Sequence, residues 1–217
     1  MSGFIIAVDG PAASGKGTIA VQLGAAYGLP VLDSGLLYRA VGVILLGEGG
    51  DLADEAAAIA AARRLDPAKL EDPAFRTRAA GEAASRVAAY PGVRAALRDF
   101  QRGFAAQPGG AVIDGRDIGT VIAPDAPAKL FVTASPETRA RRRWLQLTDA
   151  AASVAYDDIL ADIRLRDARD AGRADSPMRA ADDAVFLDTT EMSISAAADA
   201  ARRIVEAARA RWEQSQG

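Results

Sequence analysis

Residues 9–18 read Asp-Gly-Pro-Ala-Ala-Ser-Gly-Lys-Gly-Thr. They contain the pattern Gly-x-x-x-x-Gly-Lys from Gly10 to Lys16, with Gly17 where a hydroxyl residue usually stands and Thr18 one place later. Glycines let successive backbone N–H groups converge on a phosphate, and a helix that begins near Lys16 adds its dipole. The stretch therefore predicts a phosphate-binding loop in which Lys16 meets the β and γ oxygens and Thr18 holds Mg²⁺. The predicted ATP-binding residues are Gly10, Pro11, Ala12, Ala13, Ser14, Gly15, Lys16, Gly17 and Thr18.

The segments on either side of this loop give it the required context. The apolar run Phe4–Val8 predicts a buried parallel strand, and Lys16–Tyr27 has helical spacing with Ile19, Leu23 and Ala26 on one face. Further strands are predicted at 31–32, 111–114, 129–133 and 184–187, and helices at 36–46, 82–106 (interrupted near 91), 135–147, 156–171 and 194–212. Alternating strands and helices predict an α/β P-loop NTPase fold, with a parallel five-stranded sheet flanked by helices.

Composition excludes several kinds of chemistry. The chain has 217 residues with no cysteine and no histidine, which rules out disulfides, thiolate or histidine metal sites and a Ser-His-Asp triad. A formal charge of −3 argues against general nucleic-acid binding. The longest apolar runs are too short to span a bilayer, and the first residues lack the basic start of a signal peptide. We expect a cytoplasmic protein without membrane or nucleic-acid partners.

Charged residues follow two other predicted strands, where the carboxyl edge of a parallel sheet forms a binding crevice. Asp33 and Arg39 follow the second strand, and Asp114, Arg116 and Asp117 follow the third. Each arginine can hold a phosphate through two hydrogen bonds. Asp33 or Asp117 suits ribose hydroxyls, and Asp33 or Asp114 suits metal-bound water. The alternative is that each aspartate caps the next helix and each arginine pairs with an aspartate.

Arginines also recur at helical spacing between residues 139 and 173. Arg139, Arg142 and Arg143 share one side of a helix, as do Arg166, Arg169 and Arg173 on the next one. A break at Thr148–Ser153 would let the two helices fold as a hairpin that closes over ATP as a lid. We interpret Arg139 and Arg142 as a solvated, salt-bridged surface. For Arg143, Arg166 and Arg169 we favour a functional role, in which the lid brings guanidinium groups to the moving phosphoryl group.

Several motifs together resemble bacterial cytidylate kinase, a nucleoside monophosphate kinase of the P-loop class. Besides residues 9–18, they are Leu-Asp-Ser-Gly-x-x-Tyr-Arg at 32–39, Asp-Gly-Arg-Asp-x-Gly-Thr-Val at 114–121, and the segments 83–94, 124–127 and 166–170. The resemblance covers nearly the whole chain. It implies transfer of the γ-phosphoryl group of MgATP to CMP or dCMP.

The resemblance implies that the arginine-rich hairpin is the lid of the family and that Arg143, Arg166 and Arg169 act with Lys16 as the catalytic residues. It also implies roles for acceptor-binding residues. Ser85, Arg94 and Arg173 would read the cytosine and hold the acceptor. Ser34 and Asp117 would bind the ribose, and Arg39 and Arg116 the acceptor phosphate, with Tyr38 in the same motif. Cytosine presents ring acceptors at O2 and N3, which hydroxyl and guanidinium donors can reach.

The resemblance divides the chain into a core (1–46, 108–143 and 172–217), an acceptor-binding insert (about 47–107) and a lid (about 143–172). The insert departs from the family, where it commonly contains a small antiparallel sheet. Residues 51–80 are Ala-rich, lack strand alternation and predict a mostly helical segment. UMP, AMP or an alcohol such as shikimate therefore stay open as acceptors, as does a non-catalytic nucleotide-sensing module. A monomer is the default expectation.

Overall fold

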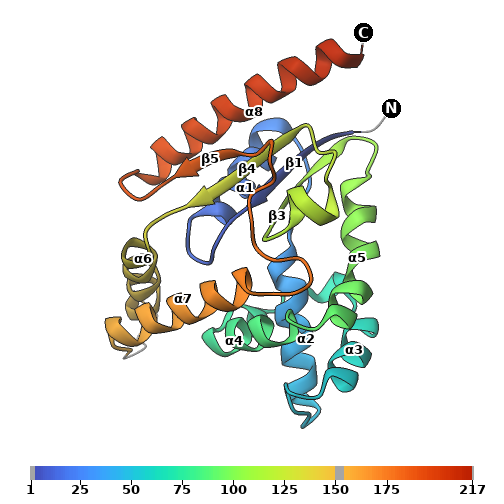
Figure 1. Cartoon of the computed structure of the whole chain (residues 1–217), viewed down its shortest axis with the longest axis vertical. Coiled ribbons are helices and arrows are strands. Elements are labelled where there is room, and N and C mark those ends of the chain that lie inside the picture. The colour runs from blue at the N-terminus through green and yellow to red at the C-terminus, as the bar shows by residue number, and fades with distance from the viewer. Residues whose placement is uncertain (1–2, 150–153, 217) are drawn as a thin grey trace. The chain divides into compact units, whose positions relative to one another are not determined.

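The structure, a computed structural model, describes residues 3–149 and 154–216. The chain divides into two units. We call Met1–Leu32 together with Ala105–Gly217 the sheet unit, and Asp33–Phe104 the helical unit. Each is described by itself below, with the elements labelled in Figure 1.

A sheet of five strands forms the centre of the sheet unit (Figure 1). Its order is β2-β3-β1-β4-β5, and the pairs β1–β3, β1–β4 and β4–β5 are parallel, with Ile6 opposite both Val112 and Ala128. The strands are β1 (Phe4–Asp9), β2 (Val31–Asp33), β3 (Gly110–Gly115), β4 (Ala128–Thr133) and β5 (Val185–Asp188). The predicted parallel five-stranded α/β architecture is confirmed.

Helices α1 (Lys16–Tyr27) and α8 (Ile194–Gln216) pack with the sheet into one apolar core. Helix α1 has the predicted bounds and ends at Gly28, whose φ of 64° is left-handed. The predicted face was wrong at one position, because Ala26 is exposed whereas Ala20 is buried. A Cβ at Gly24 would lie 2.2 Å from Val31 Cγ2, so Val31 packs directly against the last turn of α1 at Gly24.

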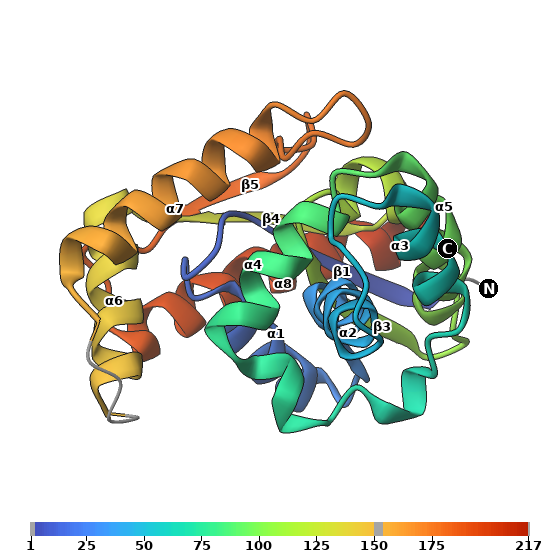
Figure 2. The same cartoon turned by 90° about the horizontal axis from the view of Figure 1, so that it is seen from below.

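Helices α6 (Pro136–Asp149) and α7 (Tyr156–Ala171) pack against each other (Figure 2) around Ala140, Ile159 and Ile163. The Ser135 hydroxyl accepts from Thr138 N at 3.1 Å and so caps the start of α6. The predicted break at Thr148–Ser153 begins too early, since α6 continues through Asp149. The remaining residues of that predicted break, 150–153, lie outside the described part of the chain.

The helical unit consists of α2 (Ser34–Gly47), α3 (Glu55–Arg63), α4 (Arg78–Val87) and most of α5 (Pro91–Ala105), with short 3₁₀ turns η1 (Pro67–Lys69) and η2 (Pro73–Arg76). Leu37, Val41 and Val87 are buried at its centre. A Cβ at Gly42 would come within 2.6 Å of Ala83 Cβ, so this glycine lets α2 and α4 approach closely. Residues 51–107, all of them described, contain no strand, as the sequence predicted.

Candidate functional site

The phosphate-binding pattern lies between strand β1 and helix α1, the context that the prediction required. Gly10 has a φ of 147°, and a Cβ there would lie 2.0 Å from Val132 O, so only glycine fits. Ala13 adopts a left-handed φ of 60° and Gly15 one of 92°. The loop therefore turns tightly at three positions before it reaches the positive end of the α1 dipole.

A cavity of about 420 Å³ opens beside this loop. It brings together the predicted residues Ala13, Ser14, Gly15, Lys16, Gly17 and Thr18. Arg142, Leu145 and Gln146 of α6 and the segment after β5, with Thr189, Met192 and Ile194, complete its lining. The mixture of loop backbone, one lysine and apolar side chains suits a molecule that has a charged end and a flat apolar end. Gly10, Pro11 and Ala12 belong to the loop but not to this lining.

Lys16 and Asp114 form an ion pair at the start of α1. Lys16 Nζ lies 3.7 Å from Asp114 Oδ2, and the two side chains are 13% and 3% exposed. A Cβ at Gly17 would lie 3.1 Å from the same Asp114 oxygen. The carboxylate thus lies beside residue 17, where a Cβ would be in tight contact with it, and Thr18, one place later, is exposed.

Asp9, the last residue of β1, lies at the start of the phosphate-binding loop and is not among the predicted site residues. Its carboxylate is buried and accepts from Ile118 N at 2.8 Å and from Gly119 N at 2.7 Å. It thereby joins the start of the phosphate-binding loop to η3 (Ile118–Ile122), a π-helical turn that directly follows Asp117. Burial raises the pKa of Asp9 from 3.8 to about 7, although the two amides favour the charged form.

Asp9 should make stability fall as the pH rises. Because its pKa is higher in the folded than in the unfolded chain, the folded state holds this proton more tightly, and the stabilisation is lost as the pH rises through about 7. A pKa of about 7 in place of 3.8 corresponds to about 4 kcal/mol at most. Asp9→Asn mimics the protonated carboxyl, so we expect it to remove this slope in urea unfolding between about pH 4 and pH 7. An unchanged slope in the variant would assign it to other groups.

Arg116 and Arg173 meet at one buried carboxylate, that of Asp170. Arg116 Nε donates to Asp170 Oδ2 at 3.0 Å, Arg173 Nη2 donates to Asp170 Oδ1, and Asp170 is 1% exposed. Burial alone would raise the pKa of Asp170, but the charges of Arg116, Arg173 and Arg166 hold it below the ordinary value. Asp117 is also buried. The prediction that Arg173 continues the helical face was wrong, because α7 ends at Ala171 and Gly172 is its C-cap.

The interpretation of Arg139 and Arg142 as a solvated, salt-bridged surface was wrong about solvation, although Arg139 does form a salt bridge. Arg139 is 3% exposed, pairs with Asp167 and donates to Ala12 O at 3.3 Å. Arg142 donates to Ser14 O at 3.4 Å and to Thr189 Oγ1 at 3.0 Å. Both contact carbonyls of the phosphate-binding loop, which the spacing of arginines along a helix does not reveal.

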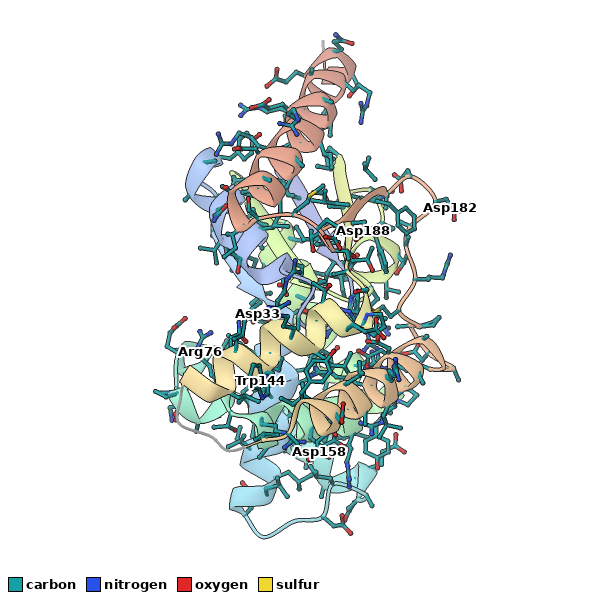
Figure 3. The ribbon with its side chains drawn as sticks, turned by 90° about the vertical axis from the view of Figure 1, so that its left-hand side faces the viewer. Asp33, Arg76, Trp144, Asp158, Asp182 and Asp188 are labelled. Atoms are coloured by element: carbon teal, nitrogen blue, oxygen red, sulfur yellow. The ribbon has the colours of Figure 1, made fainter. Side chains whose placement is uncertain are left out.

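The predicted lid arginines come from both helices of the hairpin. Arg166 and Arg169 lie half-buried on α7, and Arg143 on α6 donates to Gln146 Oε1 at 3.4 Å. Figure 3 shows the two helices from the side, with Trp144 labelled on α6 and Asp158 on α7.

Within the helical unit, four predicted acceptor-binding residues are buried: Ser34, Tyr38, Ser85 and Arg94. The Arg94 guanidinium carbon lies 5.5 Å from the centre of the Tyr38 ring, a cation–π contact. Arg39 Nη1 donates to Phe75 O at 3.2 Å and to Thr77 O at 3.1 Å. Asp33 caps α2 by accepting from Gly35 N at 2.9 Å, as the alternative reading of the strand-end aspartates expected.

A model of the family described as cytidylate kinase matches residues 6–208. The chain belongs to the cytidylate kinase family. The kinase is 66% identical to the cytidylate kinase of Caulobacter sp. (strain K31), with 99% of each chain covered. It is 68% identical to that of Caulobacter vibrioides (strain NA1000 / CB15N), with 96% of this chain and 98% of the relative covered. The family resemblance seen in its motifs is confirmed.

Among solved structures, the kinase is similar to an uncharacterized protein from Eubacterium ventriosum, with a TM-score of 0.55 and 15% identity. The alignment covers 94% of this chain and 98% of the other. At that identity the likeness concerns the fold alone. None of the helices in the described part of the kinase has both the length and the apolar character that a membrane crossing requires.

Proposed function

We propose that this kinase transfers the γ-phosphoryl group of ATP to CMP and dCMP, which gives ADP with CDP or dCDP. Its membership of the cytidylate kinase family carries the proposal. The donor would bind in the cavity beside the phosphate-binding loop, where Lys16 and the loop amides meet a partly apolar wall. Donor phosphates would lie on the loop and the adenine against residues such as Leu145 and Met192.

The acceptor phosphate is already ionised at neutral pH, so it can attack without a general base. Catalysis then consists of positioning and charge stabilisation, which suits a chain without histidine. Lys16 and the loop amides would stabilise the β and γ oxygens. Arg143, Arg166 and Arg169 would stabilise the charge that develops on the moving phosphoryl group.

We assign acceptor-binding roles within each unit by itself. In the helical unit, Arg94 and Ser85 would read the cytosine, Ser34 would bind the ribose and Arg39 the phosphate, with Tyr38 supporting them. In the sheet unit, Asp117 would bind the ribose and Arg116 the phosphate, with Arg173 supporting them. Burial of Arg94 and its contact with Tyr38 support a fixed, poorly hydrated donor, which discriminates well between bases.

Magnesium would arrive with ATP. Thr18 offers a hydroxyl in the first turn of α1 and Asp114 a carboxylate beside Gly17, and such oxygen ligands suit Mg²⁺. The part of the chain that the structure describes holds no group of three or more aspartate, glutamate, histidine or cysteine ligands. This fits an ion bound mainly through substrate phosphates and water, with Thr18 as ligand and Asp114, rather than the helix-capping Asp33, holding a water. Bound Mg²⁺ would neutralise phosphate charge.

A panel of acceptors tests the proposal. ADP release by the purified kinase is measured with MgATP and, separately, CMP, dCMP, UMP, AMP and shikimate. We expect kcat/KM for CMP and dCMP to exceed that of every other acceptor by at least about tenfold. Best turnover on another acceptor would overturn the assignment, and ATP binding without ADP release with any acceptor would favour a nucleotide-sensing module.

Gel filtration and cell fractionation check two further expectations, a monomer and a cytoplasmic location.

A further inference from the structure

Arg139 joins three elements of the sheet unit. From α6 its Nε donates to Ala134 O at 2.9 Å, and its Nη1 donates to Ala12 O at 3.3 Å in the phosphate-binding loop. The same guanidinium holds Asp167 of α7 with two hydrogen bonds, at 3.1 Å to Oδ1 and 2.5 Å to Oδ2. One planar, buried cation therefore contacts the donor loop and the second helix of the hairpin.

We propose that Arg139 and Asp167 form a positioning pair, which sets α7 and its arginines relative to the phosphate-binding loop. The inference rests on the proposed function. Asp167 directly follows Arg166 and lies two residues before Arg169. Fixing its carboxylate fixes the rotation of α7 about its axis, and hence the direction in which Arg166 and Arg169 project.

The contact to Ala12 also acts on the loop itself. Ala13 has a left-handed φ of 60°, a conformation that costs a residue with a Cβ free energy. The bond from Arg139 to the carbonyl just before Ala13 favours this turn. The pair thus orders the donor loop and aims the catalytic arginines through one guanidinium.

The hairpin does not need this pair to stay together. Ala140, Ile159 and Ile163 form an apolar cluster between α6 and α7. Glu137 and Arg164 form another pair between the same helices, at 2.7 Å, but with side chains 54% and 60% exposed. The Arg139–Asp167 pair differs from it by its burial and by its contact with the loop.

Glu137→Gln is therefore a matched control for Asp167→Asn, since each removes one carboxylate charge from a pair between α6 and α7. We expect Asp167→Asn and Arg139→Met to lower kcat about tenfold to a hundredfold, with KM for ATP within about threefold of wild type. Arg139→Lys keeps the positive charge but loses the planar guanidinium that makes two hydrogen bonds to Asp167. Its kcat should therefore lie between those of wild type and Arg139→Met. Glu137→Gln should keep kcat within about twofold.

The double variant Arg139→Met with Asp167→Asn tests coupling. If the two side chains act as one unit, its kcat should lie within about threefold of the worse single variant. A loss of kcat in the double variant equal to the product of the two single losses would overturn the proposed pair. So would kcat values of Asp167→Asn and Arg139→Met that equal the kcat of Glu137→Gln.

Hydrogen exchange gives a readout that does not depend on turnover. In the nucleotide-free protein we expect the amides of residues 12–18 to exchange at least about tenfold faster in Asp167→Asn than in wild type, and at an unchanged rate in Glu137→Gln. Faster exchange confined to α6 and α7 would mean a purely local role and would overturn the proposal. A wild-type protein that makes no CDP would defeat the proposed function, while this comparison would still decide whether the pair orders the loop.

Discussion

Replacing Lys16 by alanine should lower kcat with CMP by at least about a thousandfold and leave the protein folded. Lys16 lies in the first turn of α1 and lines the cavity beside the phosphate-binding loop. Its ammonium would follow the β and γ oxygens as charge develops, a role that loop amides fixed in position cannot take over. Initial rates of ADP release under saturating CMP and ATP measure the loss, and circular dichroism checks the fold.

Two further variants separate this role from a structural one. Lys69→Ala removes an exposed lysine from η1 and should keep kcat within about twofold. Lys16→Ala leaves Asp114 without a cation that now lies 3.7 Å away, which can lower the thermal midpoint. Adding Asp114→Asn should recover any lost stability but not turnover. Turnover restored by the second substitution would mean that Lys16 only neutralises Asp114.

The elements with strong local signals were predicted closely. Helices α1 and α7 have the predicted bounds, because Gly28 and Gly172 end them and no proline interrupts them. The strands were predicted from short apolar runs that are each followed by polar turn residues. The insert was predicted to be helical because residues 51–80 lack the alternation of apolar and polar residues that is typical of strands.

Contacts between distant residues could not be predicted in this way. The sequence indicated that Arg139 and Arg142 share a helix side, but not that this side faces the carbonyls of Ala12 and Ser14. Asp9 was visible as an acid before Gly10, yet the amides that it binds lie 109 and 110 residues further along the chain. Such roles depend on which surfaces the fold brings together.

The partner of Arg116 shows the same limit. Pairing with a nearby aspartate was the alternative at the strand end, since Asp114 and Asp117 adjoin it in sequence. The structure pairs it with Asp170, 54 residues away, which Arg173 also contacts and which no local pattern indicated. Helical spacing suggested that Arg173 lies on α7, but the helix ends before it because the chain turns at Gly172.

Arg94→Met should raise KM for CMP and lower kcat/KM for CMP by about a hundredfold to a thousandfold, with KM for ATP changed less than about threefold. Arg94 is 4% exposed on α5, and its guanidinium lies over the Tyr38 ring. Methionine keeps an apolar stem that can pack on Tyr38, while it removes every donor that could reach cytosine O2 and N3. Cytosine that loses a hydrogen bond from a charged donor loses more binding free energy in a poorly hydrated site than it would in water.

Arg86→Met is the matched control for this variant. Arg86 lies on the neighbouring helix α4 and pairs with Glu82 at 3.2 Å, with side chains 58% and 45% exposed. Removing an exposed helix pair costs a few tenths of a kcal/mol, so both KM values should stay within about twofold of wild type. If Arg94→Met raised KM for ATP as much as KM for CMP, Arg94 would support the fold of both sites instead of reading the acceptor base. Equal losses with CMP and UMP would likewise remove it from base selection, because only a contact to the cytosine edge discriminates between the two bases.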